Sequence, residues 1–133
     1  MKKKIIPLMV VLAALLIVLF NFFFKQEEPK PVTMAEYNAK IKNANKAVLV
    51  YFSAGWCTVC SKMKPVLAEM ESTYNGKLEF FKLDADRDKE VTDEFEINSL
   101  PVIMLYNHGN REWINVGIIE KGVLRSKIDP YIH

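Results

Sequence analysis

A Cys-x-x-Cys sequence at the junction of a predicted strand and a predicted helix constrains this chain more than any other feature. Cys57 and Cys60 are the only two cysteines in 133 residues. Residues 47–52 before them are apolar and rich in strand formers, and residues 63–74 after them carry apolar side chains at helical spacing. The first sulfur therefore lies at a helix N-terminus, where unpaired N–H groups and the helix dipole favour a thiolate. The pattern predicts a redox centre, with the second sulfur about one turn further along and close enough to form a disulfide.

Two other uses of a Cys-x-x-Cys pair are a structural metal site and a purely structural disulfide. A zinc site needs two more ligands at suitable spacing, and the two histidines, His108 and His133, are distant in sequence and form no pair. We therefore expect no metal. A structural disulfide stays open as an alternative, although a bridge that closes so short a loop constrains the unfolded chain little.

The N-terminal segment has the pattern of a membrane anchor. Lysines at positions 2–4 precede the apolar residues 5–24, which only Pro7 and Asn21 interrupt. At 1.5 Å per residue such a helix is about 30 Å long, which matches the hydrocarbon core of a bilayer. No small residue lies near the end of the run, as a signal-peptide cleavage site would require. We therefore expect an uncleaved single-pass transmembrane helix at residues 1–24, with membrane contact through residues 5–24.

The remaining chain divides into a tether, residues 25–32, and a domain, residues 33–133. The lysines before the apolar run should stay in the cytoplasm, which places the domain on the extracytoplasmic side of the cytoplasmic membrane. Disulfide chemistry suits that compartment. Without those three lysines the chain carries 15 basic and 16 acidic residues, and no basic patch suggests nucleic acid. The alternating charges of residues 84–90 are typical of a solvated face.

The domain should alternate helices and strands in the order α-β-α-β-α-β-β-α. A capping box formed by Thr33 and Glu36 opens the first helix, and turn residues 107–110 join the last two strands as a hairpin. This order predicts an α/β fold with a central mixed four-stranded sheet and helices on both faces. The expected helices are 33–43, 57–74, 88–95 and 121–132, and the expected strands are 47–53, 78–83, 102–106 and 111–116.

The sequence resembles the thioredoxin family from Thr33 to the C-terminus. Trp56-Cys57-x-x-Cys60 is similar to the active-site motif of that family, and Leu100-Pro101 is similar to the loop whose proline is cis and faces the two cysteines. Pro65, Lys82, Gly109 and Gly117 also fall where thioredoxins carry the same residue types.

The resemblance implies a role for each matching residue. Cys57 would be the attacking thiolate and Cys60 the buried resolving thiol. A cis Pro101 would present the backbone of Leu100 to an extended substrate strand and keep metal away from the thiols. Trp56 would cover one edge of the site. The Cys57–Cys60 disulfide would itself be the redox group, without a separate cofactor.

Two departures from the family pattern bear on the chemistry. Tyr51 occupies the position of a buried Asp beneath the second cysteine, and a phenol with a reference pKa near 10 is a poor base at neutral pH. Tyr51 and Lys82, the residue that would partner such an Asp, are candidates for proton transfer. Thr58 and Val59 lie between the cysteines in place of Gly-Pro, and no histidine stabilises the thiolate as in strong oxidants. This favours a reductant or a generic exchange enzyme.

The function expected from these features is a membrane-anchored thiol–disulfide oxidoreductase that acts on cysteines of exported proteins. It would need an electron partner, in the membrane or outside it, that the sequence does not identify, and we expect a monomer. The alternative is a thioredoxin-like binding module that uses the Pro101 groove without turnover. Retention of both cysteines and of Trp56 favours the enzyme.

Overall fold

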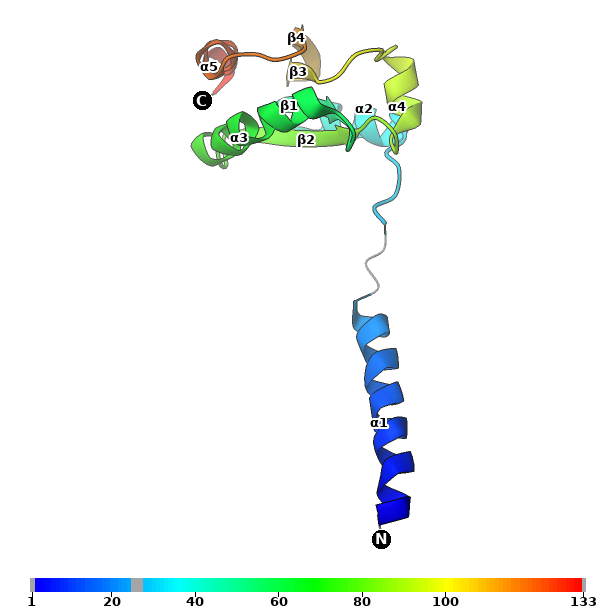
Figure 1. Ribbon diagram of the computed structural model, residues 1–133. Helices are drawn as coiled ribbons and strands as arrows, with labels where there is room; N and C mark the ends of the chain where they lie inside the picture. The colour runs from blue at the N-terminus through cyan, green and yellow to red at the C-terminus, as the bar shows by residue number, and fades with distance from the viewer. Residues whose placement is uncertain (1, 25–27, 133) are drawn as a thin grey trace.

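The computed structural model of the protein describes residues 2–24 and 28–132, with side chains from Pro7 onward. A long helix leads to an α/β domain in which helices lie on both sides of a sheet (Figure 1). In chain order the elements are α1 (Lys2–Phe23), α2 (Met34–Lys42), β1 (Ala47–Ser53), α3 (Thr58–Thr73), β2 (Leu78–Asp84), α4 (Lys89–Glu94), β3 (Val102–Asn107), β4 (Asn110–Val116), α5 (Lys121–Ile128) and a short 3-10 turn, Asp129–Tyr131.

The sheet has four strands in the order β2-β1-β3-β4, and only the β1–β2 pair is parallel. Residues 47–52 of the central strand β1 are all buried. Alternate side chains of β1 enter two separate hydrophobic clusters, one shared with α3 and α5 and the other shared with α2 and α4. The expected mixed four-stranded thioredoxin-like fold is therefore confirmed.

Local sequence signals set most of the element ends. Both hydrogen bonds of the expected capping box at Thr33 are present at the start of α2. His108 and Gly109 both have positive φ, 47° and 83°, as the two central residues of a tight β3–β4 hairpin turn require. The last helix is shorter than expected, because α5 ends at Ile128 rather than Ile132. Pro130 lacks the N–H that would continue the α-helical hydrogen bonds, and the chain turns into a 3-10 segment there.

The N-terminal apolar run forms helix α1, and every side chain of α1 from Pro7 onward is exposed. None of the helices in the described part of the chain combines the length and the apolar character needed to cross a membrane. The transmembrane helix expected at residues 5–24 is thus not found among the described residues. The side chains of residues 5 and 6, where the expected span begins, and residues 25–27 of the expected tether lie outside that part.

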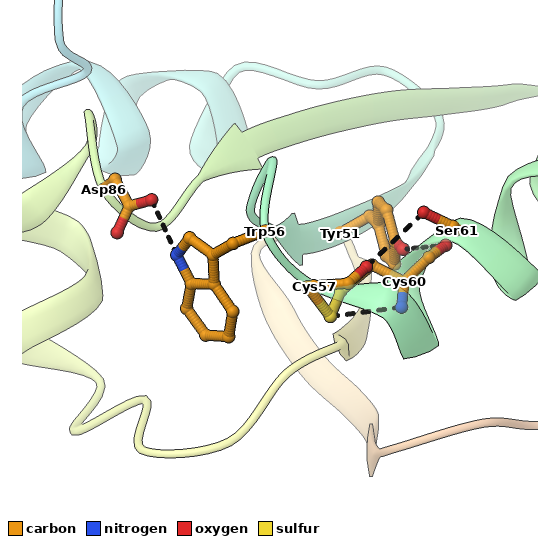
Figure 2. Close-up of a disulfide and its surroundings, with 6 residues drawn as sticks. All are labelled: Tyr51, Trp56, Cys57, Cys60, Ser61 and Asp86. Carbon is orange, nitrogen blue, oxygen red and sulfur yellow. Dashed lines mark hydrogen bonds between the residues drawn. A yellow bond between two sulfur atoms is a disulfide. The ribbon is translucent and has the colours of Figure 1, made fainter.

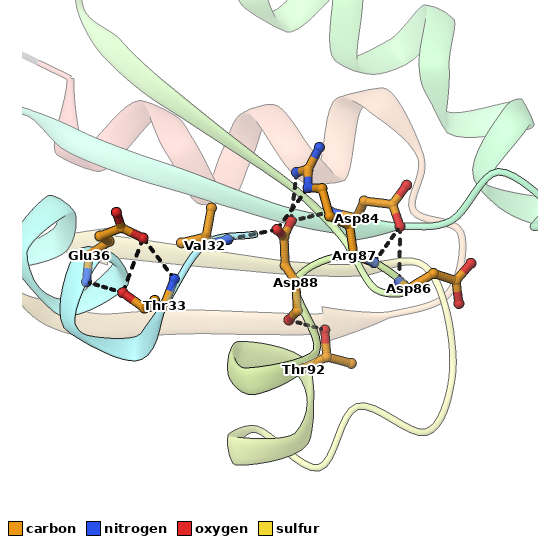
Figure 3. A network of polar contacts seen from close by, with 8 residues as sticks. All are labelled: Val32, Thr33, Glu36, Asp84, Asp86, Arg87, Asp88 and Thr92. Atoms are coloured by element: carbon orange, nitrogen blue, oxygen red, sulfur yellow. Dashed lines mark hydrogen bonds and ion pairs between the residues drawn. The ribbon is translucent and has the colours of Figure 1, made fainter. Parts of the chain in front are cut away.

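The charged segment after β2 corrects one expectation from the sequence. Residues 84–90 alternate in charge and were expected to form a solvated face, but Asp88 is 0% exposed. Its carboxylate accepts hydrogen bonds from the backbone N–H groups of Val32 and Asp84, and it also forms an ion pair with Arg87 (Figure 3). Charge alternation is a local pattern, whereas this burial depends on a segment of chain 56 residues away.

These contacts lower the pKa of Asp88. Burial alone would raise it, but the hydrogen bonds from Arg87, Val32 and Asp84 favour the charged carboxylate and outweigh burial, so the pKa lies below its ordinary value. The carboxylate therefore stabilises the fold at any pH above the unfolded-state pKa of about 3.9. This contribution disappears as the pH falls through the lower, folded-state pKa.

Asp88→Asn should lower the free energy of unfolding at pH 7 by about 1.5–3 kcal/mol, the usual range for hydrogen bonds to a charged group. Urea unfolding from pH 7 to pH 3 should show a constant difference from wild type above about pH 4 and a shrinking one below it. Asp93→Asn, at an exposed position on α4, is the control and should change little. A difference that stayed constant down to pH 3 would contradict this account of Asp88.

Candidate active site

Cys57 and Cys60 form a disulfide at the N-terminus of α3, just beyond the end of β1 (Figure 2). Cys57 is the N-cap residue of the helix, and its sulfur accepts a hydrogen bond from the backbone N–H of Cys60 at 3.1 Å. Of the two side chains Cys57 is the more accessible, 6% exposed against 1% for Cys60. In the reduced state, the same N–H and the helix dipole would stabilise a thiolate on Cys57.

The loop before β3 packs against the two cysteines. The Leu100–Pro101 peptide bond is cis, as the family resemblance implied. Leu100 packs on the small cluster formed by Ala54, Cys57 and Cys60. In the described part of the chain, neither backbone polar group of Leu100 has a hydrogen-bond partner, so both are available to another chain.

Trp56 lies beside the disulfide with 70% of its surface exposed. Its indole N–H donates a hydrogen bond to the Asp86 carboxylate at 2.9 Å, and this bond fixes one end of the ring (Figure 2). Asp86 was not identified from the sequence, because it is an exposed residue of the charged run and its partner Trp56 lies 30 residues away along the chain. The two residues between the cysteines, Thr58 and Val59, are exposed on the first turn of α3.

Tyr51 is buried beneath the first turn of α3. Its hydroxyl donates to the backbone carbonyl of Cys60 at 3.3 Å, so among the described contacts it meets the peptide group rather than the sulfur. Burial raises the pKa of Tyr51 above its usual value, which makes a phenolate still less accessible near neutral pH. Tyr51 is therefore suited to donate a hydrogen bond to the chain around Cys60, and unsuited to accept the proton of the thiol.

Lys82 is opposite Tyr51 in the β1–β2 ladder, as the sequence positions implied, but its charge is directed elsewhere. Its ammonium group pairs with Glu71 of α3 at 2.6 Å. All three side chains line a cavity of about 250 Å³ behind the active-site helix. Glu71 was not identified from the sequence, although it follows Leu67 by four residues and so lies on the same face of the helix.

Among the described residues, no three His, Cys, Asp or Glu side chains form a group that could hold a metal ion. Both sulfurs are already joined to each other.

Comparison with known proteins identifies the family. The family model described as thioredoxin matches residues 28–130. The thioredoxin of Pseudomonas aeruginosa is 34% identical over 101 residues, which are 76% of this chain and 94% of that protein. The thioredoxin of Pyropia yezoensis is 32% identical over the same shares of the two chains. The chain belongs to the thioredoxin family.

This thioredoxin-family chain is a protein-disulfide oxidoreductase of the thioredoxin type, with an active-site Cys-x-x-Cys formed by Cys57 and Cys60. Its redox group is the disulfide itself, as in thioredoxins. The fold agrees with a solved structure from a study of thiol resolution in the yeast mitochondrial 1-Cys peroxiredoxin through the glutathione and thioredoxin systems. The TM-score is 0.66 at 24% identity, over 76% of this chain and 93% of that one.

Two substitutions of Tyr51 separate a structural role from a role in proton transfer. Tyr51→Phe removes only the hydroxyl and should leave the rate of the resolving step unchanged. Tyr51→Asp supplies a base near Cys60 and should accelerate that step, at a cost of about several kcal/mol for burying a carboxyl group. Stopped-flow reduction of a disulfide substrate measures the rate, and urea unfolding measures the cost.

The ion pair at Lys82 provides a control for the Tyr51 experiment. Adding Glu71→Gln to Tyr51→Asp frees Lys82 to pair with the new carboxylate and should recover part of the lost stability. A slower resolving step in Tyr51→Phe would show instead that the phenol takes part in proton transfer.

Proposed function

We propose that this protein reduces or exchanges disulfides in exported proteins, with Cys57 as the nucleophile and Cys60 as the resolving thiol. The observation that carries the proposal is the asymmetry of the pair. Cys57 caps the helix and is the more exposed residue of the two, whereas Cys60 lies one turn inside and is more deeply buried. A thiolate therefore forms at the sulfur that a substrate can reach.

The chemistry takes place in two exchange steps. The Cys57 thiolate attacks one sulfur of a substrate disulfide, forms a mixed disulfide and releases the other sulfur as a thiolate. Cys60 then loses its proton to water or to the released thiolate, attacks the Cys57 sulfur and displaces the second substrate sulfur. The substrate gains two electrons from the dithiol, one proton that Cys60 releases and one proton from solvent, and the domain ends as the Cys57–Cys60 disulfide. A dithiol donor, in the membrane or outside it, would return the disulfide to the reduced state.

The surroundings of the disulfide favour the reducing direction. Strong oxidants of this fold stabilise their reduced form through extra interactions with the thiolate, which raises the potential from about −270 mV towards about −120 mV. Thr58 and Val59 are exposed and supply no histidine to the thiolate, and Tyr51 contributes no charge. The helix N-terminus and the Cys60 N–H are left as the main sources of stabilisation for Cys57.

Substrate would bind as an extended segment along the cis-proline loop. The free backbone N–H and carbonyl of Leu100 can pair with such a segment, while the Leu100 side chain packs the loop against the cysteines. The exposed face of Trp56 would cover the substrate next to its cysteine. These contacts involve mostly backbone, which suits an enzyme that acts on many sequences, and they require only one copy of the chain.

We also propose that α1 attaches the domain to the extracytoplasmic face of the cytoplasmic membrane. The support is the apolar run of residues 5–24 after three lysines, and the exposure of its large apolar side chains, from 43% at Leu19 to 79% at Phe22. In water, a helix that is apolar all round would expose this surface at a high cost in free energy. Residues 25–32 would then serve as the tether and residues 33–133 as the catalytic domain.

The nucleophile and the substrate class can be tested by trapping in the native cell. Cys60→Ser should accumulate mixed disulfides through Cys57 with exported proteins, because resolution by Cys60 is blocked. Cys57→Ser should trap few or none. Equilibration of the purified full chain with glutathione should give a potential nearer about −270 mV than about −120 mV. Trapping that depended on Cys60, or partners confined to the cytoplasm, would overturn the proposal.

Membrane attachment is tested separately by washing cell membranes at alkaline pH. The wild-type chain should stay with the lipid, and external protease should digest the domain in spheroplasts. Leu15→Arg places a charge in the middle of the apolar run, costs about 2.5–3.5 kcal/mol on insertion, and should release part of the protein. Asn21→Arg, near the end of the run, is the matched control and should release much less. Complete release of the wild-type chain would rule out the anchor.

A further inference from the structure

The buried Asp88 carboxylate joins two parts of the chain that are far apart in sequence. One oxygen accepts the backbone N–H of Val32 at 2.9 Å, and the other accepts the backbone N–H of Asp84 at 2.8 Å. Arg87 donates to both oxygens, at 2.9 and 2.7 Å. The last residue before the α2 cap is thereby attached to the loop that follows β2 (Figure 3).

The same loop supports the active-site tryptophan. The Asp84 carboxylate accepts the backbone N–H groups of Asp86 and Arg87, at 2.9 and 3.2 Å, and so closes the loop on itself. The backbone N–H of Ala85 bonds to the carbonyl of Ser53 at the end of β1, at 2.8 Å. Held in this way, Asp86 reaches the indole N–H of Trp56.

We propose that Asp88 is a positioning residue for Trp56, and that the hydrogen bond from the Val32 N–H is required for this role. A continuous set of hydrogen bonds runs from Val32 through Asp88 and the Asp84 loop to Asp86 and the indole. The segment that leads into the domain therefore belongs to the support of the active site. The inference rests on Trp56 flanking bound substrate, as the proposed function has it.

The chemistry of the Asp88 carboxylate explains why the loss of its hydrogen bond from Val32 affects a residue as distant as Trp56. A buried charge is stable only while its donors surround it, and removing one donor leaves the group short of partners in a medium that solvates it poorly. The carboxylate then gains by rotating or by admitting water. Either change alters its bond to the Asp84 N–H, on which the Asp86 loop depends.

Val32→Pro tests this hydrogen-bond network without changing any side chain of the loop. Proline removes the Val32 N–H that bonds to Asp88, and it keeps a similar apolar body. Val32→Ala is the first control, because it shortens the side chain and retains the N–H. Met34→Pro is the second, because it removes the neighbouring N–H that bonds to Glu90, at a first helical position where proline is tolerated.

The measurement is the indole ¹H–¹⁵N signal of Trp56 in the full chain, in detergent. The protein has two tryptophans. Trp113 packs against the hydrophobic cluster shared with α3 and α5, on the other face of the sheet from α2, and serves as an internal reference. Asp86→Ala gives the position of the unbonded indole. In Val32→Pro the Trp56 signal should move from its wild-type position towards that of Asp86→Ala, with the ratio of bonded to unbonded indole falling about threefold or more.

Val32→Ala and Met34→Pro should leave the Trp56 signal at its wild-type position, and Trp113 should not move in any variant. A Trp56 signal unchanged in Val32→Pro, while Asp86→Ala shifts it, would overturn the proposal. An equal shift in Met34→Pro would do so too, because it would indicate general loosening of the N-terminal segment. Insulin reduction by the wild-type chain is assayed in parallel, so that a failure of the proposed activity is recognised separately from a failure of the coupling.

Discussion

The burial of β1 on both faces is the constraint on which the rest of the domain depends. Each face of this strand packs against its own pair of helices, so its register cannot slip by one residue without exchanging two sets of core side chains. Because the register of β1 is fixed, the position of its C-terminal end is fixed as well. Cys57 follows only four residues later, as the cap of α3, and Asp84 ends the parallel neighbour β2 at the same edge. The position of the redox site is therefore set by core packing rather than by any contact among the catalytic residues.

Signals confined to a few neighbouring residues were sufficient to predict most elements and the central disulfide. The apolar run of β1, the capping box at Thr33 and the turn at Gly109 each determine local backbone geometry. The two sulfurs are close in sequence, so their proximity follows from one helical turn. The end of α5 was missed even though its cause, Pro130, is local, because the apolar spacing continues to Ile132.

The missed residues are those whose partners are distant in sequence. Asp86, Asp88 and Glu71 look like ordinary surface charges until the fold brings Trp56, Val32 and Lys82 beside them. Amino-acid composition and hydrophobic periodicity do not predict such long-range contacts, because the same charge pattern fits a fully solvated loop. For a related reason, contacts within the chain do not determine the environment of α1. Its side chains are exposed within the described chain, and what surrounds them depends on the medium.

The chain buries its negative charge beside the redox site rather than beneath it. Among the described residues, Asp88 is the one charged side chain that is fully buried, and it accepts hydrogen bonds from three residues, Val32, Asp84 and Arg87. At position 51, beneath Cys60, a carboxylate would meet Lys82 only if that lysine left Glu71. A phenol needs a single acceptor there, and the Cys60 carbonyl provides it. The arrangement places a neutral phenol rather than a carboxylate beneath Cys60, so no negative charge at position 51 opposes the Cys57 thiolate. It also means that the proton of Cys60 has to leave through water or substrate. The phenol at position 51 therefore has two effects: it makes the Cys57 thiolate easier to form and the mixed disulfide harder to resolve.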